Sequence, residues 1–130
     1  MAAKKKAEAL AKKEAAANKK AATAAKKKAA ALEKKAIATA DLYYKLREYQ
    51  AATKSYQNVL QDYPDTRTAA QIRMQILRAS YELAINSVDS KIEERLEDAI
   101  DSYKIFKERH GDNQALMEEA EKIYNTITER

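Results

Sequence analysis

Histidine and carboxylate side chains are the groups in this chain whose types could support catalysis or metal binding. His110 is the only one of its type among 130 residues, and cysteine is absent. A histidine dyad, a cysteine nucleophile and a thiolate metal site therefore each lack a member. Beside Gly111, His110 is expected to act as a local cap or to face solvent. Four carboxylates recur at helical spacing, as they do on solvated helices: Glu93, Glu94, Asp98 and Asp101. We expect no enzymatic activity, no cofactor, no metal site and no small-molecule substrate.

The eight tyrosines are the other candidates, because aromatic rings can stack on nucleic-acid bases. Six fall on the expected inner faces of helices: Tyr43, Tyr49, Tyr56, Tyr81, Tyr103 and Tyr124. Their helical spacing favours core packing over base stacking. Tyr44 and Tyr63 are not placed by this spacing. Both are candidates for a partner-binding surface, since tyrosine provides large contact area at low entropic cost.

The elements that must position these residues are predicted to be helices alone. One Gly, one Pro and abundant Ala, Lys, Glu and Leu indicate an all-α protein with short connections. The hydrophobic pattern predicts helices over about residues 2–46, 49–62, 66–86, 90–109 and 113–128. In the first of these, a stripe of small and apolar residues continues through positions 36, 39, 43 and 46.

Local signals predict where these helices begin and end. Asp65 or Thr66 is expected to cap the third helix. Ser90 and Glu93 have the spacing of a capping box, which would open the fourth. Gly111 is expected to end that helix in the left-handed conformation.

Small and aromatic residues are spaced as in repeated helical hairpins. The tetratricopeptide pattern has an aromatic in its first helix, Ala-x-x-x-aromatic in its second and a closing proline. The chain matches it at Tyr43, Ala52, Tyr56 and Pro64. Ala99 begins a second Ala-x-x-x-Tyr motif 47 residues after the first, whereas the standard repeat is about 34 residues long. We expect four parts. Residues 1–32 form an Ala/Lys-rich helical extension that is continuous with the first repeat helix, and residues 33–66 form the first repeat. Residues 67–111 form an expanded second repeat, and residues 112–130 form a C-terminal capping helix.

Five segments taken together resemble one family: Ala40–Tyr49, Asp62–Thr66, Ile76–Ser87, Lys91–Arg95 and Glu118–Tyr124. Over about residues 33–130 the chain is similar to the C-terminal repeats of BamD-type outer-membrane assembly lipoproteins, in their Bacteroidetes-like form. The resemblance implies a non-enzymatic scaffold on the periplasmic face of the outer membrane, in the machine that inserts β-barrels. The family's signal peptide and lipidated cysteine are not found, so we expect a soluble chain carrying the docking half.

The resemblance also implies where partners bind. In that family the C-terminal repeats dock other outer-membrane assembly subunits. The outer surfaces of the last two helices are therefore expected to be free for docking. Together with Tyr44 and Tyr63, the candidate partner-binding residues are Arg95, Glu118, Glu119 and Lys122.

The charge distribution leaves two alternatives open. Residues 1–40 hold 12 Lys against 3 Glu, a net charge of +9, and the other 90 residues have a net charge of −4. A solvated helix accounts for the lysines. They would also suit a binder of nucleic acid or acidic lipid, whose affinity would fall steeply with salt. The Ala/Lys segment is equally compatible with an engineered helical-repeat fusion.

Overall fold

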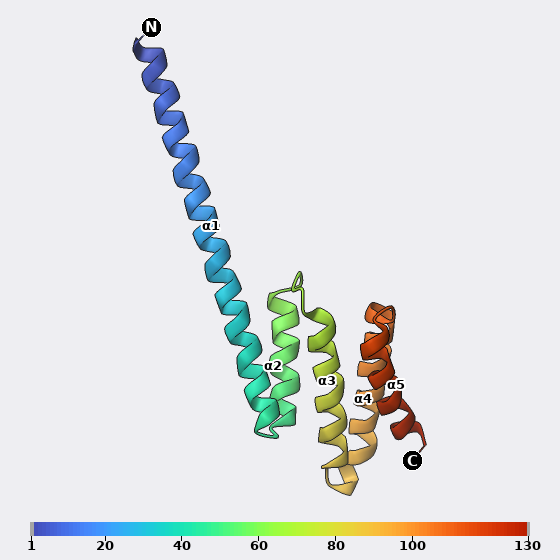
Figure 1. Ribbon diagram of the computed structural model, residues 1–130. Coiled ribbons are helices and arrows are strands. Elements are labelled where there is room, and N and C mark those ends of the chain that lie inside the picture. Colours follow the sequence, from blue (N-terminus) through green and yellow to red (C-terminus); the bar gives the residue numbers. More distant parts are fainter. Residues whose placement is uncertain (1, 130) are drawn as a thin grey trace. The chain divides into compact units, whose positions relative to one another are not determined.

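The computed structural model describes the backbone of residues 2–129 and the side chains of residues 20–129. The described chain is almost entirely helical (Figure 1), with α1 (Ala2–Lys45), α2 (Tyr49–Asp62), α3 (Ala69–Ile85), α4 (Asp89–His110) and α5 (Gln114–Thr128). The predicted all-α class is confirmed, and α1 covers both the Ala/Lys-rich segment and the first repeat helix. The chain divides into two compact units, Met1–Lys35 and Ala36–Arg130.

Within the second unit the helices form consecutive antiparallel hairpins (Figure 1). α2 packs on α3, α3 packs on α4, and α5 contacts both α3 and α4. One hydrophobic cluster joins α1, α2 and α3, with Ala40, Ala52, Tyr56, Val59, Ile72, Ile76 and Ala79 at its centre. A second joins α3, α4 and α5 around Met74, Leu77, Tyr103, Phe106, Met117 and Ala120. This is the predicted arrangement of helical hairpins.

Small residues lie fully buried in the clusters that neighbouring helices share. Ala52 on α2 and Ala99 on α4 are both 0% exposed. Tyr56 and Tyr103 follow each alanine after one helical turn and are also buried. The ring of Tyr103 stacks on that of Tyr124 from α5 at 4.4 Å between centroids. The Ala-x-x-x-Tyr motif thus has the packing role that its spacing predicted.

The face of α1 that packs on the hairpins shares Ala36 with the predicted stripe and departs from it farther along the helix. Ala36, Ile37 and Tyr44 pack against the first cluster, whereas Tyr43 is 37% and Leu46 61% exposed. The expectation that Tyr43 points inward is therefore wrong, and Tyr44 takes that place. Tyr44 contacts the ring of Tyr49 edge to face, with the centroids 5.6 Å apart.

Two predicted helix starts are also wrong. α3 begins at Ala69 and has no side-chain cap, because the hydroxyl of Thr66 accepts from the N–H of Thr68 inside the preceding turn, at 3.4 Å. α4 begins at Asp89, after Val88 in extended conformation. Ser90 is therefore the second helical residue and does not cap the helix. The capping box does not form.

Gly111 follows α4 for a different reason from the one expected. Its φ of −63° and ψ of −17° are right-handed, not left-handed. A Cβ at this position would lie 2.5 Å from the carbonyl oxygen of Lys107. Glycine is required here because the chain passes so close to the last turn of the helix.

The turn between α1 and α2 does adopt the left-handed conformation, at Arg47 with φ of 62°. The N–H of Arg47 donates to the carbonyl of Tyr44 at 3.1 Å, and that of Glu48 to Tyr43 at 2.9 Å. These two bonds are the Schellman pattern, in which glycine is the usual left-handed residue.

We expect Arg47→Gly to raise the free energy of unfolding. The left-handed conformation costs an L-residue roughly 1–2 kcal/mol, and glycine's extra backbone entropy costs roughly 0.5–1 kcal/mol. The net gain should be about 0.5–1 kcal/mol. Urea unfolding measures it, with Lys45→Gly in the last turn of α1 as a control that should destabilise by a similar amount. A loss of stability in Arg47→Gly would show that the arginine side chain stabilises the turn.

Candidate functional site

A continuous chain of hydrogen bonds runs through side chains of α1, α2, α3 and α5. Tyr56 Oη donates to a carboxylate oxygen of Asp41 and accepts from Gln75 Nε2 at 3.1 Å. Arg78 Nη1 donates to Gln75 Oε1 at 2.6 Å. The same guanidinium donates through Nε and Nη2 to both carboxylate oxygens of Glu119, the second bond being 2.7 Å long. These five side chains bind the two ends of the hairpin stack together.

The electrostatics of this chain are consistent with a structural role. The hydrogen bonds that Arg78 donates to Glu119 raise the pKa of Arg78 above its ordinary value. Burial and the bond to Asp41 raise the pKa of Tyr56. Burial and the nearby Glu82 raise that of Tyr44. Each group therefore keeps its usual charge at neutral pH, and none is poised to exchange a proton.

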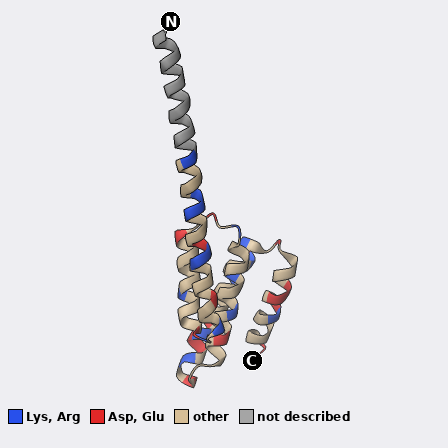
Figure 2. Cartoon of the chain, turned by 60° about the vertical axis from the view of Figure 1, so that its left-hand side comes forward, with Lys and Arg blue, Asp and Glu red and all other residues tan. Residues whose placement is uncertain are grey.

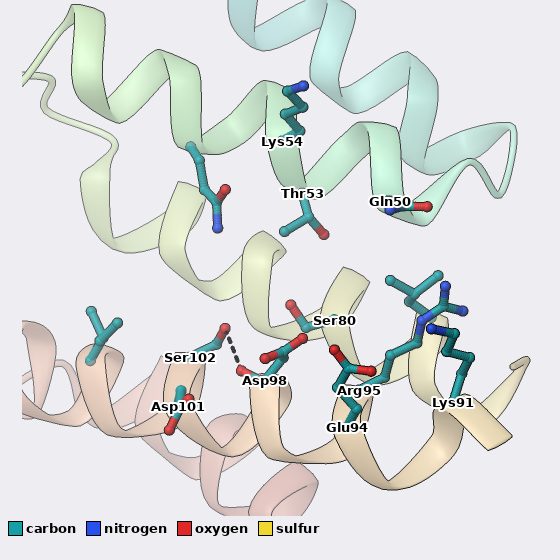
Figure 3. Close-up of a pocket in the computed structure, with 13 residues that line it drawn as sticks. Gln50, Thr53, Lys54, Ser80, Lys91, Glu94, Arg95, Asp98, Asp101 and Ser102 are labelled. Carbon is teal, nitrogen blue, oxygen red and sulfur yellow. Dashed lines mark hydrogen bonds between the residues drawn. The ribbon is translucent and has the colours of Figure 1, made fainter. Parts of the chain in front are cut away.

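A groove of about 720 Å³ lies between α2 and α4, with Ser80 of α3 on its floor (Figure 3). α2 contributes polar side chains, among them Gln50, Thr53 and Lys54. α4 contributes basic and acidic groups, including Lys91, Glu94, Arg95, Asp98 and Asp101. Two cations and three carboxylates thus lie along the α4 wall. A mixed wall of this kind suits a polar partner segment that carries both charges.

A cluster of side chains that could bind a metal ion is not found among the described residues. Over residues 20–129, no three His, Asp or Glu side chains gather closely enough to hold a metal ion. None of the described helices is long and apolar enough to cross a membrane.

The six candidate partner-binding residues do not form one surface. Glu118 and Lys122 are exposed one turn apart on α5. Tyr63 is half-buried at the end of α2, where its N–H donates to Val59 at 2.8 Å. Tyr44 is half-buried against Tyr49. Of the six candidates, only Glu118 and Lys122 are charged residues on an exposed face.

Two of the six are occupied within the fold. The expectation that Glu119 is free on the outer surface is wrong, because Arg78 holds it from α3. Arg95 Nη1 donates to Ser87 Oγ and so closes the connection between α3 and α4, although Arg95 also lines the groove.

His110 is half-buried and does not cap a helix as expected. Its ring lies 5.5 Å from that of Phe106, and its Nε2 is buried without a hydrogen-bond partner. Burial lowers its pKa, and the nearby Arg73 lowers it further. The imidazole is thus neutral at neutral pH. Among the described residues, no hydrogen bond orients its Nε2 as a partner in acid–base chemistry would.

The sequence interpretation did not single out Asp41, Gln75 and Arg78. A signal was present, since Gln75 and Arg78 are polar, one turn apart, and next to the buried apolar residues of α3. Such a pair on an inner helix predicts a polar contact between elements. Its partner on α5 is 41 residues away in sequence.

Comparisons with known proteins do not extend this description. No protein-family model matches the chain, and no curated protein matches it significantly.

Proposed function

We propose that the chain is a non-enzymatic scaffold that binds another protein through its helical hairpins. The observation that supports this most is the α2/α4 groove on a stack whose ends are tied by the Asp41 to Glu119 hydrogen-bond chain. A rigid, preorganised surface loses little entropy when it binds a partner. Helical-repeat proteins generally present such extended surfaces.

The sequence resemblance supplies the class of partner in this proposal. It points to the docking half of a BamD-type lipoprotein, with other outer-membrane assembly subunits as partners on the periplasmic face. Glu118 and Lys122 carry the docking prediction, because among the six candidates they are the exposed charges of α5.

A double charge swap tests the proposal. The double variant Glu118→Lys with Lys122→Glu keeps the net charge of the chain. It should capture the partner protein at least about tenfold more weakly and keep the same melting temperature, since exposed charges at the rim of an interface affect binding more than stability. Capture is measured at moderate salt against periplasmic domains of a β-barrel assembly machine. Lys104→Glu with Glu108→Lys, an exposed pair of equal spacing on α4, is the matched control.

Each result of this assay decides something. Equal capture by both double variants and by the unmodified chain would place the interface away from α5. If neither the unmodified chain nor either double variant captured a periplasmic domain, the proposed partner class would be overturned.

A second candidate function rests on the lysines of α1. Lys20, Lys26, Lys27, Lys28 and Lys34 are exposed, and the described part of α1 carries basic residues in Figure 2. The side chains of residues 1–19 lie outside the described part. If this segment binds DNA or anionic vesicles, binding should fall by orders of magnitude between low and moderate salt. Deletion of residues 1–31 would abolish that binding and leave partner capture intact under the scaffold proposal.

A further inference from the structure

A small cleft of about 210 Å³ lies where α2, α3 and α4 meet. Its apolar wall is formed by Leu60, Ile76 and Ile105, one from each helix. Ile105 is 48% exposed, an unusual position for a large aliphatic side chain beside other apolar groups. Covering this wall would remove apolar surface from water, which favours an aliphatic ligand.

Two arginines, Arg73 of α3 and Arg109 of α4, also line this cleft. Among the side chains of residues 20–129, no ion pair within 4.0 Å is found for Arg73 or Arg109, whereas Arg78 of α3 has one with Glu119. Neither cleft arginine therefore has a carboxylate partner in the described part of the chain.

The surroundings of these arginines are electropositive. Burial lowers the pKa of Arg73, and the neighbouring charge of Arg109 lowers it further. The pKa of His110 is lowered mainly by burial and then by the positive charge of Arg73, whereas the carboxylate of Asp112 raises it. Arg73 is partly buried and Arg109 is exposed beside it. Their two guanidinium groups thus repel each other, and neither is paired with a carboxylate of the described side chains. A bound anion would relieve this repulsion.

We propose that this cleft binds an aliphatic carboxylate, whose charged group is held by Arg73 and Arg109 and whose chain lies on Leu60, Ile76 and Ile105. The guanidinium group offers parallel N–H donors that match the two oxygens of a carboxylate. The apolar wall beside the arginines selects against small inorganic anions. This inference goes beyond the scaffold function and does not depend on it.

The test uses the full chain, labelled with nitrogen-15, in an NMR titration with hexanoate and with hexanamide. Hexanoate should shift the backbone amides of residues 57–60, 73–76 and 102–109. Hexanamide should bind these residues at least about tenfold more weakly, since it lacks the charge that strengthens the hydrogen bonds. Equal binding of the two compounds, hexanoate shifts confined to other residues, or no shifts at all would each overturn the proposal.

Variants locate the charge requirement. Arg73→Gln and Arg109→Gln should each weaken hexanoate binding about tenfold. Arg47→Gln, an exposed arginine in the turn between α1 and α2 that does not line the cleft, is the matched control. Unchanged binding in both cleft variants would overturn the proposal. Should either variant fail to fold, the comparison of acid and amide on the unmodified chain decides the question alone.

A third probe separates two sources of the carboxylate. The peptide acetyl-Ala-Ala-Leu is titrated with its terminus free and with it amidated. Tighter binding of the free peptide than of hexanoate, at the same amides, assigns the cleft to the end of a polypeptide. Tighter binding of hexanoate assigns it to a free fatty acid. Both results support a carboxylate cleft, and neither bears on the α5 docking assay.

Discussion

Ala52→Leu and Ala99→Leu should each lower the free energy of unfolding by about 1–3 kcal/mol, the usual cost of overpacking a core. Both alanines are fully buried between helices. Ala52 lies in the cluster shared by α1, α2 and α3, and Ala99 lies in one with Ala84, Leu96 and Ile127. Because neither side chain reaches solvent, a leucine at either position should push the packed helices apart.

Urea unfolding followed by circular dichroism measures this effect. Ala115→Leu, at an exposed position on α5, is the control with the same change of side chain, and it should leave stability within about 0.5 kcal/mol of the unmodified chain. If both buried variants unfolded at the same urea concentration as the control, the helices would not pack closely around these alanines in solution. The tetratricopeptide-like interpretation of the motif would then lose its basis.

Helix positions could be predicted because local signals agree with one another. Pro64 cannot continue α2, and the bounds of α2 were predicted correctly from its pattern of Ala52, Tyr56 and Val59. The second motif at Ala99 works in the same way. In such segments the same residues both favour the helix and form its buried face, so propensity and packing give one answer.

The rotation of α1 could not be predicted because alanine is spread around the helix. Ala40 is buried and Tyr44 is half-buried, while Tyr43 and Leu46 on the predicted stripe are exposed. Because alanines lie on several faces of α1, these faces have almost equal apolar area, and the sequence does not favour one of them. The choice between the two tyrosines is then made by the neighbouring helix, through the contact of Tyr44 with Tyr49.

Part of the candidate site escaped prediction for a related reason. The partners of Arg78 depend on how α3 and α5 cross, and the pairing of Arg73 with Arg109 in one cleft depends on α3 and α4. Spacing within a helix does not encode these distances. Glu118 and Glu119 are adjacent acidic residues in the sequence, yet one is exposed and the other is held by Arg78.

That difference makes the second large prediction. Glu119→Lys should lower the free energy of unfolding by about 1–2 kcal/mol, because it removes a bidentate ion pair and places an ammonium beside a guanidinium. The side chains of Arg78 and Glu119 are 32% and 42% exposed, so solvent screening keeps the cost below that of a fully buried pair. Glu118→Lys makes the same charge change one residue away and should have almost no effect.

A double-mutant cycle separates the pair from general charge effects. Arg78→Ala, Glu119→Ala and the double variant should give a coupling energy of about 0.5–2 kcal/mol. Arg78→Ala should cost more than Glu119→Ala, because it also removes the donor to Gln75 and so breaks the chain that reaches Tyr56. Equal effects of Glu118→Lys and Glu119→Lys, with no coupling in the cycle, would mean that α5 is not tied to α3 through this pair. The rigidity on which the scaffold proposal depends would then have to come from the apolar contacts of α5 alone.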